Sequence, residues 1–117
     1  MASFAPVGNG AMMDASRTVG NGAKMGASRT VGLKDAGYPV ALKSLNDPPD
    51  PLRYIGDLSV LEKPCVAIVG SRKATDYGRW ATMSLARKLS EHGVVVVSGM
   101  AEGIDSFAHR GALEGPT

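Results

Sequence analysis

The sequence of 117 residues contains one cysteine and no long apolar run, and these two scarcities exclude several classes of protein. One cysteine cannot form an internal disulfide, and it fits a reducing compartment such as the cytoplasm. No apolar run approaches the roughly 20 residues of a membrane-spanning helix. The amino terminus also lacks the basic start and apolar centre of a secretory signal. We therefore expect a cytoplasmic chain that does not interact with membranes.

Common signatures of nucleotide, metal and catalytic chemistry are missing as well. The chain has neither the Gly-x-Gly-x-x-Gly dinucleotide fingerprint nor the Gly-x-x-x-x-Gly-Lys-Ser/Thr phosphate loop. It has no cysteine–histidine cluster, so no metal site is predicted. No activated nucleophile or pair of carboxylates is visible at the candidate site described below. We therefore expect no catalytic residue, no cofactor and no enzymatic activity.

The net charge of +2 is too small to indicate a partner, but the charge is unevenly distributed. Residues 65–88 carry five cations and one aspartate, a balance of +4. Residues 89–117 carry one arginine and four acids, a balance of −3. The electropositive part of the chain is therefore residues 65–88, and this is where a phosphate group would bind.

The first 32 residues contain a 12-residue duplication. Residues 7–18 recur almost unchanged as residues 19–30, and a third copy begins at Val31. The repeat is rich in Gly, Ser and Ala and lacks apolar periodicity, so we expect residues 1–33 to form a disordered tail. A tandem duplication without a selected role is favoured over a basic arm for nucleic acid. Such an arm would use Arg17, Lys24, Arg29 and Lys34.

Residues 34–64 form a different segment, which we expect to lead into a sheet and pack on it. The proline-rich stretch 46–51 predicts a turn with extended backbone. Residues 52–55 predict an edge strand, and the two tyrosines of the segment, Tyr38 and Tyr54, are interpreted as packing residues.

Residues 65–117 predict an α/β fold, namely a partial Rossmann-like parallel sheet in the order βαβα. The β-branched runs 66–69 and 94–97 each end at a glycine turn, which is typical of buried parallel strands. A helix is predicted between them, with Thr75 as its cap and Gly93 at its end. Parallel strands joined in this way end at one sheet edge, where ligands of open α/β sheets bind.

The helical periodicity predicts which side chains face the sheet. For the first helix these are Trp80, Met83, Leu85, Ala86 and Leu89. The second helix begins near Gly103, and its predicted sheet-facing residues are Ile104, Phe107, Ala108 and Ala112. Cys65, at the start of the first strand, is predicted to be a small apolar core residue.

The Gly70-Ser71-Arg72 turn after the first strand is the main candidate site. Glycine lets the backbone turn sharply and approach a ligand, and the N-terminus of the following helix favours an anion. Ser71 adds a hydroxyl, Arg72 adds a cation suited to phosphate, and Thr75 caps the helix. The alternative is a plain β–α turn with an exposed arginine.

A second turn, Ser98-Gly99, follows the other strand and is expected beside the first. Ser98 offers a hydroxyl and Gly99 an unobstructed backbone N–H, while Gly103 allows helix and sheet to approach closely. An ordinary loop is again the alternative. Two such turns on one edge are more specific than either alone, and together they predict a phosphate-binding site.

Asp105 and His109 lie one helical turn apart, so their side chains can meet. A catalytic dyad is one interpretation of this spacing. A helix-surface ion pair or an orienting hydrogen bond is the commoner case.

With these residues in place, the chain resembles the DNA-processing protein A family, also called Smf. The resemblance covers residues 38–114, and order and spacing both fit. Four stretches carry it: Tyr38-Pro39 with Leu42; Asp47-Pro48-Pro49 with Leu52, Tyr54 and Gly56; residues 66–72 with Thr75, Tyr77 and Gly78; and Ser98-Gly99 with Ala101, Gly103-Ile104-Asp105, Ala108-His109 and Ala112-Leu113.

The resemblance implies an extended Rossmann-like domain that binds single-stranded DNA, dimerises, and helps to load the recombinase RecA in natural transformation. It places Gly70, Ser71 and Arg72 in a basic pocket for DNA phosphate, and Ser98 and Gly99 there more loosely. The family domain has several more strands than the two parallel strands expected here, which implies a truncated copy.

Three functions compete on this sequence. The leading hypothesis is a module that binds single-stranded DNA without catalysis. The second is a nucleotide-binding, phosphoribohydrolase-like enzyme. The absence of the Pro-Gly-Gly-x-Gly-Thr signature counts against it. The third is a non-functional fragment that needs another chain to fold, because a sheet of two strands is marginal.

Overall fold

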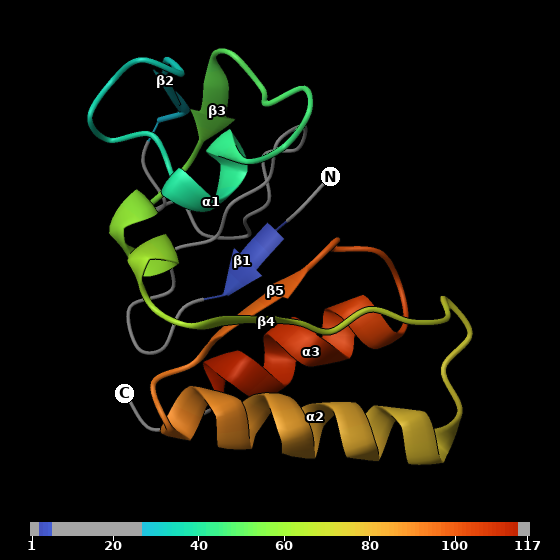
Figure 1. Cartoon of the computed structure of the whole chain (residues 1–117). Coiled ribbons are helices and arrows are strands. Elements are labelled where there is room, and N and C mark those ends of the chain that lie inside the picture. The colour runs from blue at the N-terminus through green and yellow to red at the C-terminus, as the bar shows by residue number, and fades with distance from the viewer. Residues whose placement is uncertain (1–2, 6–26, 115–117) are drawn as a thin grey trace.

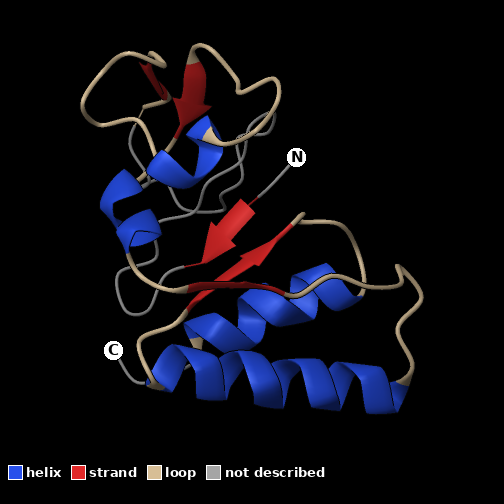
Figure 2. Cartoon of the chain, viewed as in Figure 1, coloured by secondary structure: helices blue, strands red, loops and turns tan. Residues whose placement is uncertain are grey.

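The structure is a computed structural model that describes residues 3–5 and 27–114, the first of these by their backbone alone (Figures 1 and 2). Along the chain its elements are β1 (Ser3–Ala5), β2 (Arg29–Val31), α1 (Val40–Lys43), β3 (Leu52–Tyr54), the 3-10 helix η1 (Leu58–Glu62), β4 (Cys65–Ala67), α2 (Asp76–Glu91), β5 (Val95–Ser98) and α3 (Ile104–Leu113). No helix in these residues has the length and apolarity to cross a bilayer.

The central sheet has the strand order β1-β5-β4, and the predicted parallel pair lies within it. β4 and β5 run parallel with Cys65 opposite Val95, and α2 connects them along the chain. The third strand, β1, pairs antiparallel with the other side of β5. This third strand corrects the sequence analysis, which expected a sheet of two strands and assigned residues 1–33 to a disordered tail.

The layers lie on opposite faces of this sheet, with α2 and α3 on one face and the lead-in segment on the other (Figure 2). Successive side chains of a strand point to opposite faces, and β5 therefore takes part in both cores. Val96 is buried in a cluster with alanines of α2 and α3. Val97 packs against the lead-in cluster formed by Val31, Tyr38 and Leu52.

The lead-in segment begins earlier than the sequence predicts. β2 pairs antiparallel with β3, and Val31 is buried although it belongs to the expected tail. An apolar side chain at the start of the third repeat copy thus finds partners more than twenty residues away in β3. Residues 29–31 are therefore a strand and not part of a disordered tail. Residues 1–2 and 6–26 of the expected tail lie outside the described part of the chain.

Both tyrosines of the lead-in segment pack, as predicted. Tyr38 is 2% exposed, and its hydroxyl donates a hydrogen bond of 2.6 Å to the carbonyl of Pro49. Tyr54 is half-buried against the same cluster, and the guanidinium of Arg29 lies 5.1 Å from its ring centroid.

The predicted ends of α2 are confirmed. The side chain of Thr75 accepts a hydrogen bond of 3.0 Å from the backbone N–H of Gly78, which satisfies one orphan donor of the first turn. At the other end Gly93 has φ +76°, and Val94 N–H donates to the carbonyl of Leu89 at 3.0 Å. Together with the bond from Gly93 to Ser90, this is a Schellman motif.

The predicted sheet-facing stripe of α2 is wrong at two positions. Trp80 and Leu85 are 65% and 52% exposed, whereas the buried residues of α2 are Thr82, Ala86 and Ser90. The reason is the close approach of α3. A Cβ at Gly111 would lie 2.6 Å from the carbonyl oxygen of Met83, so only small side chains fit between the two helices.

β4 differs from the prediction of a buried strand. All three of its residues are exposed, Cys65 included, while Val95 and Val96 of β5 are fully buried. β4 is the edge strand, and none of the described residues pairs with its outer side. Cys65 is therefore a free, exposed thiol and not a core residue. Partial burial raises its pKa.

Candidate functional site

The two predicted turns meet at the carboxyl edge of the parallel strands. The hydroxyl of Ser98 donates a hydrogen bond of 2.7 Å to the carbonyl of Ile68, the residue that precedes the first turn by two positions. The backbone N–H of Ile104, at the start of α3, donates to the carbonyl of Ser71 at 3.1 Å. The structure thus joins both the end of β5 and the start of α3 to the loop that follows β4.

Two of the predicted glycines make this contact sterically feasible. A Cβ at Gly70 would lie 2.8 Å from Cγ1 of Ile104. A Cβ at Gly103, where φ is +81°, would clash with the carbonyl oxygen of Ser71 and lie 2.5 Å from that of Arg72. These glycines therefore allow the first turn to sit on the N-terminus of α3.

The second turn has little left to offer a ligand. Ser98 is buried, and its hydroxyl is used by Ile68. The backbone N–H of Gly99 donates to a carboxylate oxygen of Asp105 at 3.1 Å, and that of Ala101 donates to the same oxygen at 3.4 Å. This loop thus contains its own anion, so the structure differs from the prediction that Ser98 and Gly99 present free donors.

Asp105 and His109 do not form a hydrogen-bonded dyad, because neither ring nitrogen of His109 has a partner in the described part of the chain and Asp105 accepts from the backbone of this loop. His109 is 5% exposed on the inner side of α3. Burial lowers the pKa of its imidazole, while the backbone of Ser98 and the charge of Asp105 act in the opposite direction. The carboxylate of Asp105 therefore holds the loop through two backbone donors, whereas the two buried ring nitrogens of His109 have no hydrogen-bond partner among the described residues.

The first turn is exposed and cationic. Arg72 and Lys73 are both exposed, and neither forms an ion pair with another described residue. The hydroxyl of Ser71 accepts a hydrogen bond of 3.1 Å from the N–H of Lys73, which fixes the turn locally. Thr75 then caps α2, whose N-terminus favours an anion. Of the predicted site residues, Arg72 is therefore free to bind a ligand beside this helix end. Lys73, which the sequence analysis did not nominate, is exposed next to it.

The sequence analysis did not predict that two aromatic residues next to this turn are exposed. Tyr77 and Trp80 lie on the outer side of α2 with their ring centroids 5.9 Å apart. The signal that could have found them is the small-residue stripe Gly78, Thr82 and Ala86. Its spacing of four fixes the inner face of the helix and leaves the aromatic residues outside.

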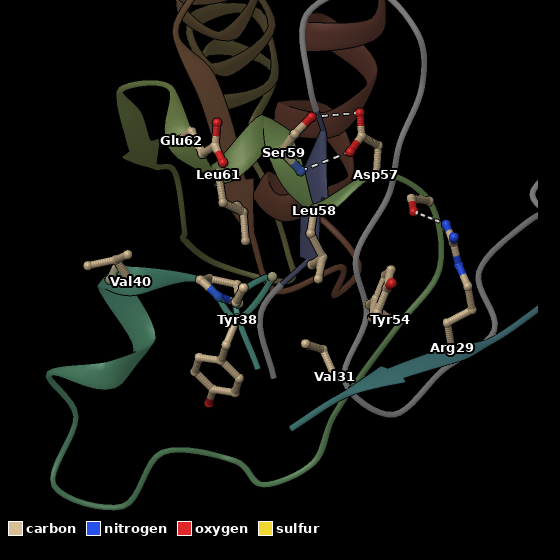
Figure 3. A pocket seen from close by; sticks show the side chains of 15 residues that line it. Arg29, Val31, Tyr38, Val40, Tyr54, Asp57, Leu58, Ser59, Leu61 and Glu62 are labelled. Carbon is tan, nitrogen blue, oxygen red and sulfur yellow. Dashed lines mark hydrogen bonds between the residues drawn. The ribbon is translucent and has the colours of Figure 1, made fainter. Parts of the chain in front are cut away.

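A cavity in the lead-in segment lies elsewhere and is lined by none of the predicted site residues. It has a volume of about 620 Å³ and is lined by residues of β2, α1, β3 and η1 (Figure 3). Two charges at its rim already have partners. A guanidinium N–H of Arg29 donates to the carbonyl of Gly56 at 2.7 Å. Asp57 accepts hydrogen bonds from Ser59 at the start of η1, and these lower the pKa of its carboxyl.

Comparison with protein families gives a match over most of the chain. The family described as DNA recombination-mediator protein A matches residues 29–117. The chain belongs to this family. This membership confirms the resemblance to DNA-processing protein A, and the α/β architecture agrees with it.

Individual members of the recombination-mediator family are about 40% identical to the chain. The DNA processing protein DprA of Bacillus subtilis is 40% identical over 78 residues, which are 66% of this chain and 26% of that protein. DprA of Streptococcus pneumoniae is 41% identical over 80 residues, 68% of this chain and 28% of the relative. The chain thus spans about a quarter of the length of these relatives.

A solved structure of the family is similar in fold. It is described as revealing the single-stranded DNA binding mode of DNA processing protein A from Helicobacter pylori. The TM-score is 0.66 at 40% identity, over 74% of this chain and 39% of that one.

Proposed function

We propose that this chain binds single-stranded DNA through its phosphates, at the first turn and the N-terminus of α2. The observation that carries the proposal is the pair of exposed cations Arg72 and Lys73, which have no acidic partner among the described residues. They stand beside a helix end that favours negative charge. Family membership and the DNA-binding relative from Helicobacter pylori support the same ligand.

The second turn has a supporting role in this proposal. Because Asp105 occupies the donors of Gly99 and Ala101, the second turn shapes the site without touching phosphate. Gly70 and Gly103 hold the first turn against α3. Of the seven residues that the sequence nominates, Arg72 is therefore the one we propose as the principal phosphate contact.

The test is a titration of fluorescently labelled single-stranded DNA with the parent chain and with Arg72→Ala, at several salt concentrations. Loss of one charged contact should weaken binding by about tenfold. It should also lower the slope of log K against log salt by about 0.7, the value for one phosphate on a single strand. The weakening should be similar for all base sequences, because phosphate contacts carry no sequence information.

Arg87→Ala is the matched control. Arg87 lies near the far end of α2 and is held by Glu91 at 3.1 Å, so its removal should change affinity much less. An Arg72→Ala chain that binds as tightly as the parent, with the same salt slope, would remove the phosphate site.

We also propose that the chain acts in the cytoplasm, in natural transformation, where it assists a recombinase of the RecA type and forms a homodimer. Membership in a family of recombination-mediator proteins supports these roles, and the chain spans about a quarter of the length of the relatives it matches. Assembly of RecA on single-stranded DNA, followed with and without the chain, tests the partnership. Sedimentation equilibrium tests the dimer.

The proposal contains no catalytic step. The side chains that could have formed a dyad, Asp105 and His109, are both buried, and Asp105 is held by backbone donors. A phosphoribohydrolase-like activity would be detected as release of free base from nucleoside monophosphates. Such release by the purified chain would favour the enzyme.

A further inference from the structure

The outer face of α2 carries an exposed aromatic pair that the phosphate site does not use. Tyr77 is 74% and Trp80 65% exposed. The two rings are tilted by 37° to one another. With most of both side chains exposed, the pair presents aromatic surface to a further planar group.

The surroundings of this pair show which kind of partner fits it. The same side of the helix continues, at spacings of three and four residues, with Ala81, Ser84 and Lys88. Lys88 is exposed and forms no ion pair with a described residue. The strip therefore contains aromatic rings, a hydroxyl and a cation. Leu85, which is 52% exposed four residues after Ala81, borders it.

The strip is continuous with the proposed phosphate site. Arg72 and Lys73 lie just before α2, and Tyr77 is five residues from Arg72, a span of at most about 18 Å. Tyr77 and Lys88 are separated by about 16 Å along the helix. Cations thus lie before and after an aromatic pair on the exposed side of α2, which forms the outermost layer of the fold (Figure 1). A single nucleic acid strand has the complementary order, with anionic phosphates alternating with flat bases.

We propose that Tyr77 and Trp80 form a stacking platform for the bases of the single strand whose phosphates bind at Arg72 and Lys73. This inference rests on the proposed function and extends it from the phosphates to the bases. Stacking of this kind tolerates any base, since every base has a π-face. The platform should therefore raise affinity without conferring sequence preference.

Trp80 is the only tryptophan of the chain, so its fluorescence reports on the platform directly. The parent chain is titrated with an oligothymidylate of about 16 nucleotides, at the upper end of common single-strand site sizes, and with an abasic strand of equal length. The oligothymidylate should quench Trp80, and the abasic strand, which keeps the phosphates, should not. Affinity for the abasic strand should also be lower.

Variants separate stacking from charge. Tyr77→Ala and Trp80→Ala should each weaken oligothymidylate binding by about 5- to 150-fold, the range that base–aromatic stacking supports, with an unchanged salt slope. In the double variant the preference for oligothymidylate over the abasic strand should disappear, and Trp80→Phe should restore most of it. Leu85→Ala removes an exposed apolar side chain at the border of the strip and should bind like the parent, because leucine offers no ring for stacking.

The outcomes distinguish this inference from the one on which it rests. If Arg72→Ala weakens binding while Tyr77→Ala and Trp80→Ala bind like the parent, the platform is wrong and the phosphate site stands. If the parent binds neither strand, both are overturned. If Trp80→Ala abolishes self-association in sedimentation and leaves DNA affinity intact, the strip is a contact between copies of the chain and the platform is again wrong.

Discussion

At the scale of single residues, burial changes the chemistry of His109. It is nearly inaccessible on the inner side of α3, and burial disfavours the charged imidazole, which lowers its pKa from the ordinary value. The folded chain therefore holds a neutral ring where the unfolded chain takes up a proton below about pH 6.5.

We predict that the free energy of unfolding falls as the pH drops below about 6.5, by up to roughly 1.4 kcal/mol per pH unit. The sign follows from the lowered pKa: stability is present above the unfolded value and is lost as the pH falls toward the folded one. Urea unfolding at a series of pH values between about 7 and 5 measures it. Asp57, whose carboxyl pKa is also lowered, acts only under more acidic conditions.

The second histidine provides the control. His92 is exposed, so His92→Gln should keep this pH dependence, whereas His109→Gln should flatten it. A direct NMR titration of the parent should give His109 a pKa below 6.5. A value at or above 6.5 would contradict the argument even if His109→Gln fails to fold.

At the scale of elements, two glycines with similar φ angles have different structural roles. Gly93 ends α2 at φ +76°, and a Cβ there would meet no atom within 4 Å. Gly103 begins α3 at φ +81°, and a Cβ there would press on the carbonyl oxygens of Ser71 and Arg72. One glycine supplies a backbone conformation, and the other also supplies space between two loops.

Alanine substitution should separate these two roles. Gly93→Ala should destabilise the chain by about 1 kcal/mol, because an L-residue is strained at positive φ. Gly103→Ala adds steric overlap with backbone and should cost a further 1–3 kcal/mol or so. It should also weaken DNA binding, since the Arg72 turn must move. Chemical unfolding of both variants measures the difference, and equal destabilisation would show that the contact between the loops contributes nothing.

The features of these elements that the sequence predicts are the local ones. Thr75, Gly93 and the parallel strands follow from turn chemistry and from short β-branched runs. The inner face of α2 does not, because it is set by how closely α3 approaches at Gly111. The pairing of β2 with β3 is equally hard to foresee, since a three-residue strand gives little periodicity. At the site, proximity of the two turns is predictable, but the occupation of one of them by Asp105 depends on side-chain geometry.

At the scale of the whole molecule, the core between the sheet and the helices is made of small side chains. Its buried members are Ala86, Val96, Ala108 and Ala112. Three alanines bury little apolar area, and the hydrophobic free energy scales with that area. Several larger apolar side chains, among them Val69 and Leu85, stay exposed. Small domains bury only about 60% of the surface that their unfolded chains expose, so this core gives the folded chain only a small free energy of unfolding.

We therefore expect the isolated chain to unfold below about 60 °C, and small losses in this core to shift its midpoint strongly. Val96 and Val69 allow a matched test, because the first is fully buried and the second is 70% exposed. Val96→Ala should cost about 1–2 kcal/mol and lower the midpoint by roughly 4–16 °C. Val69→Ala should stay within about 0.5 kcal/mol of the parent. Thermal unfolding followed by circular dichroism gives both values. A monomeric parent that unfolds cooperatively well above 60 °C, or a Val96→Ala chain with an unshifted midpoint, would show that the free energy of unfolding does not depend on this alanine-rich core.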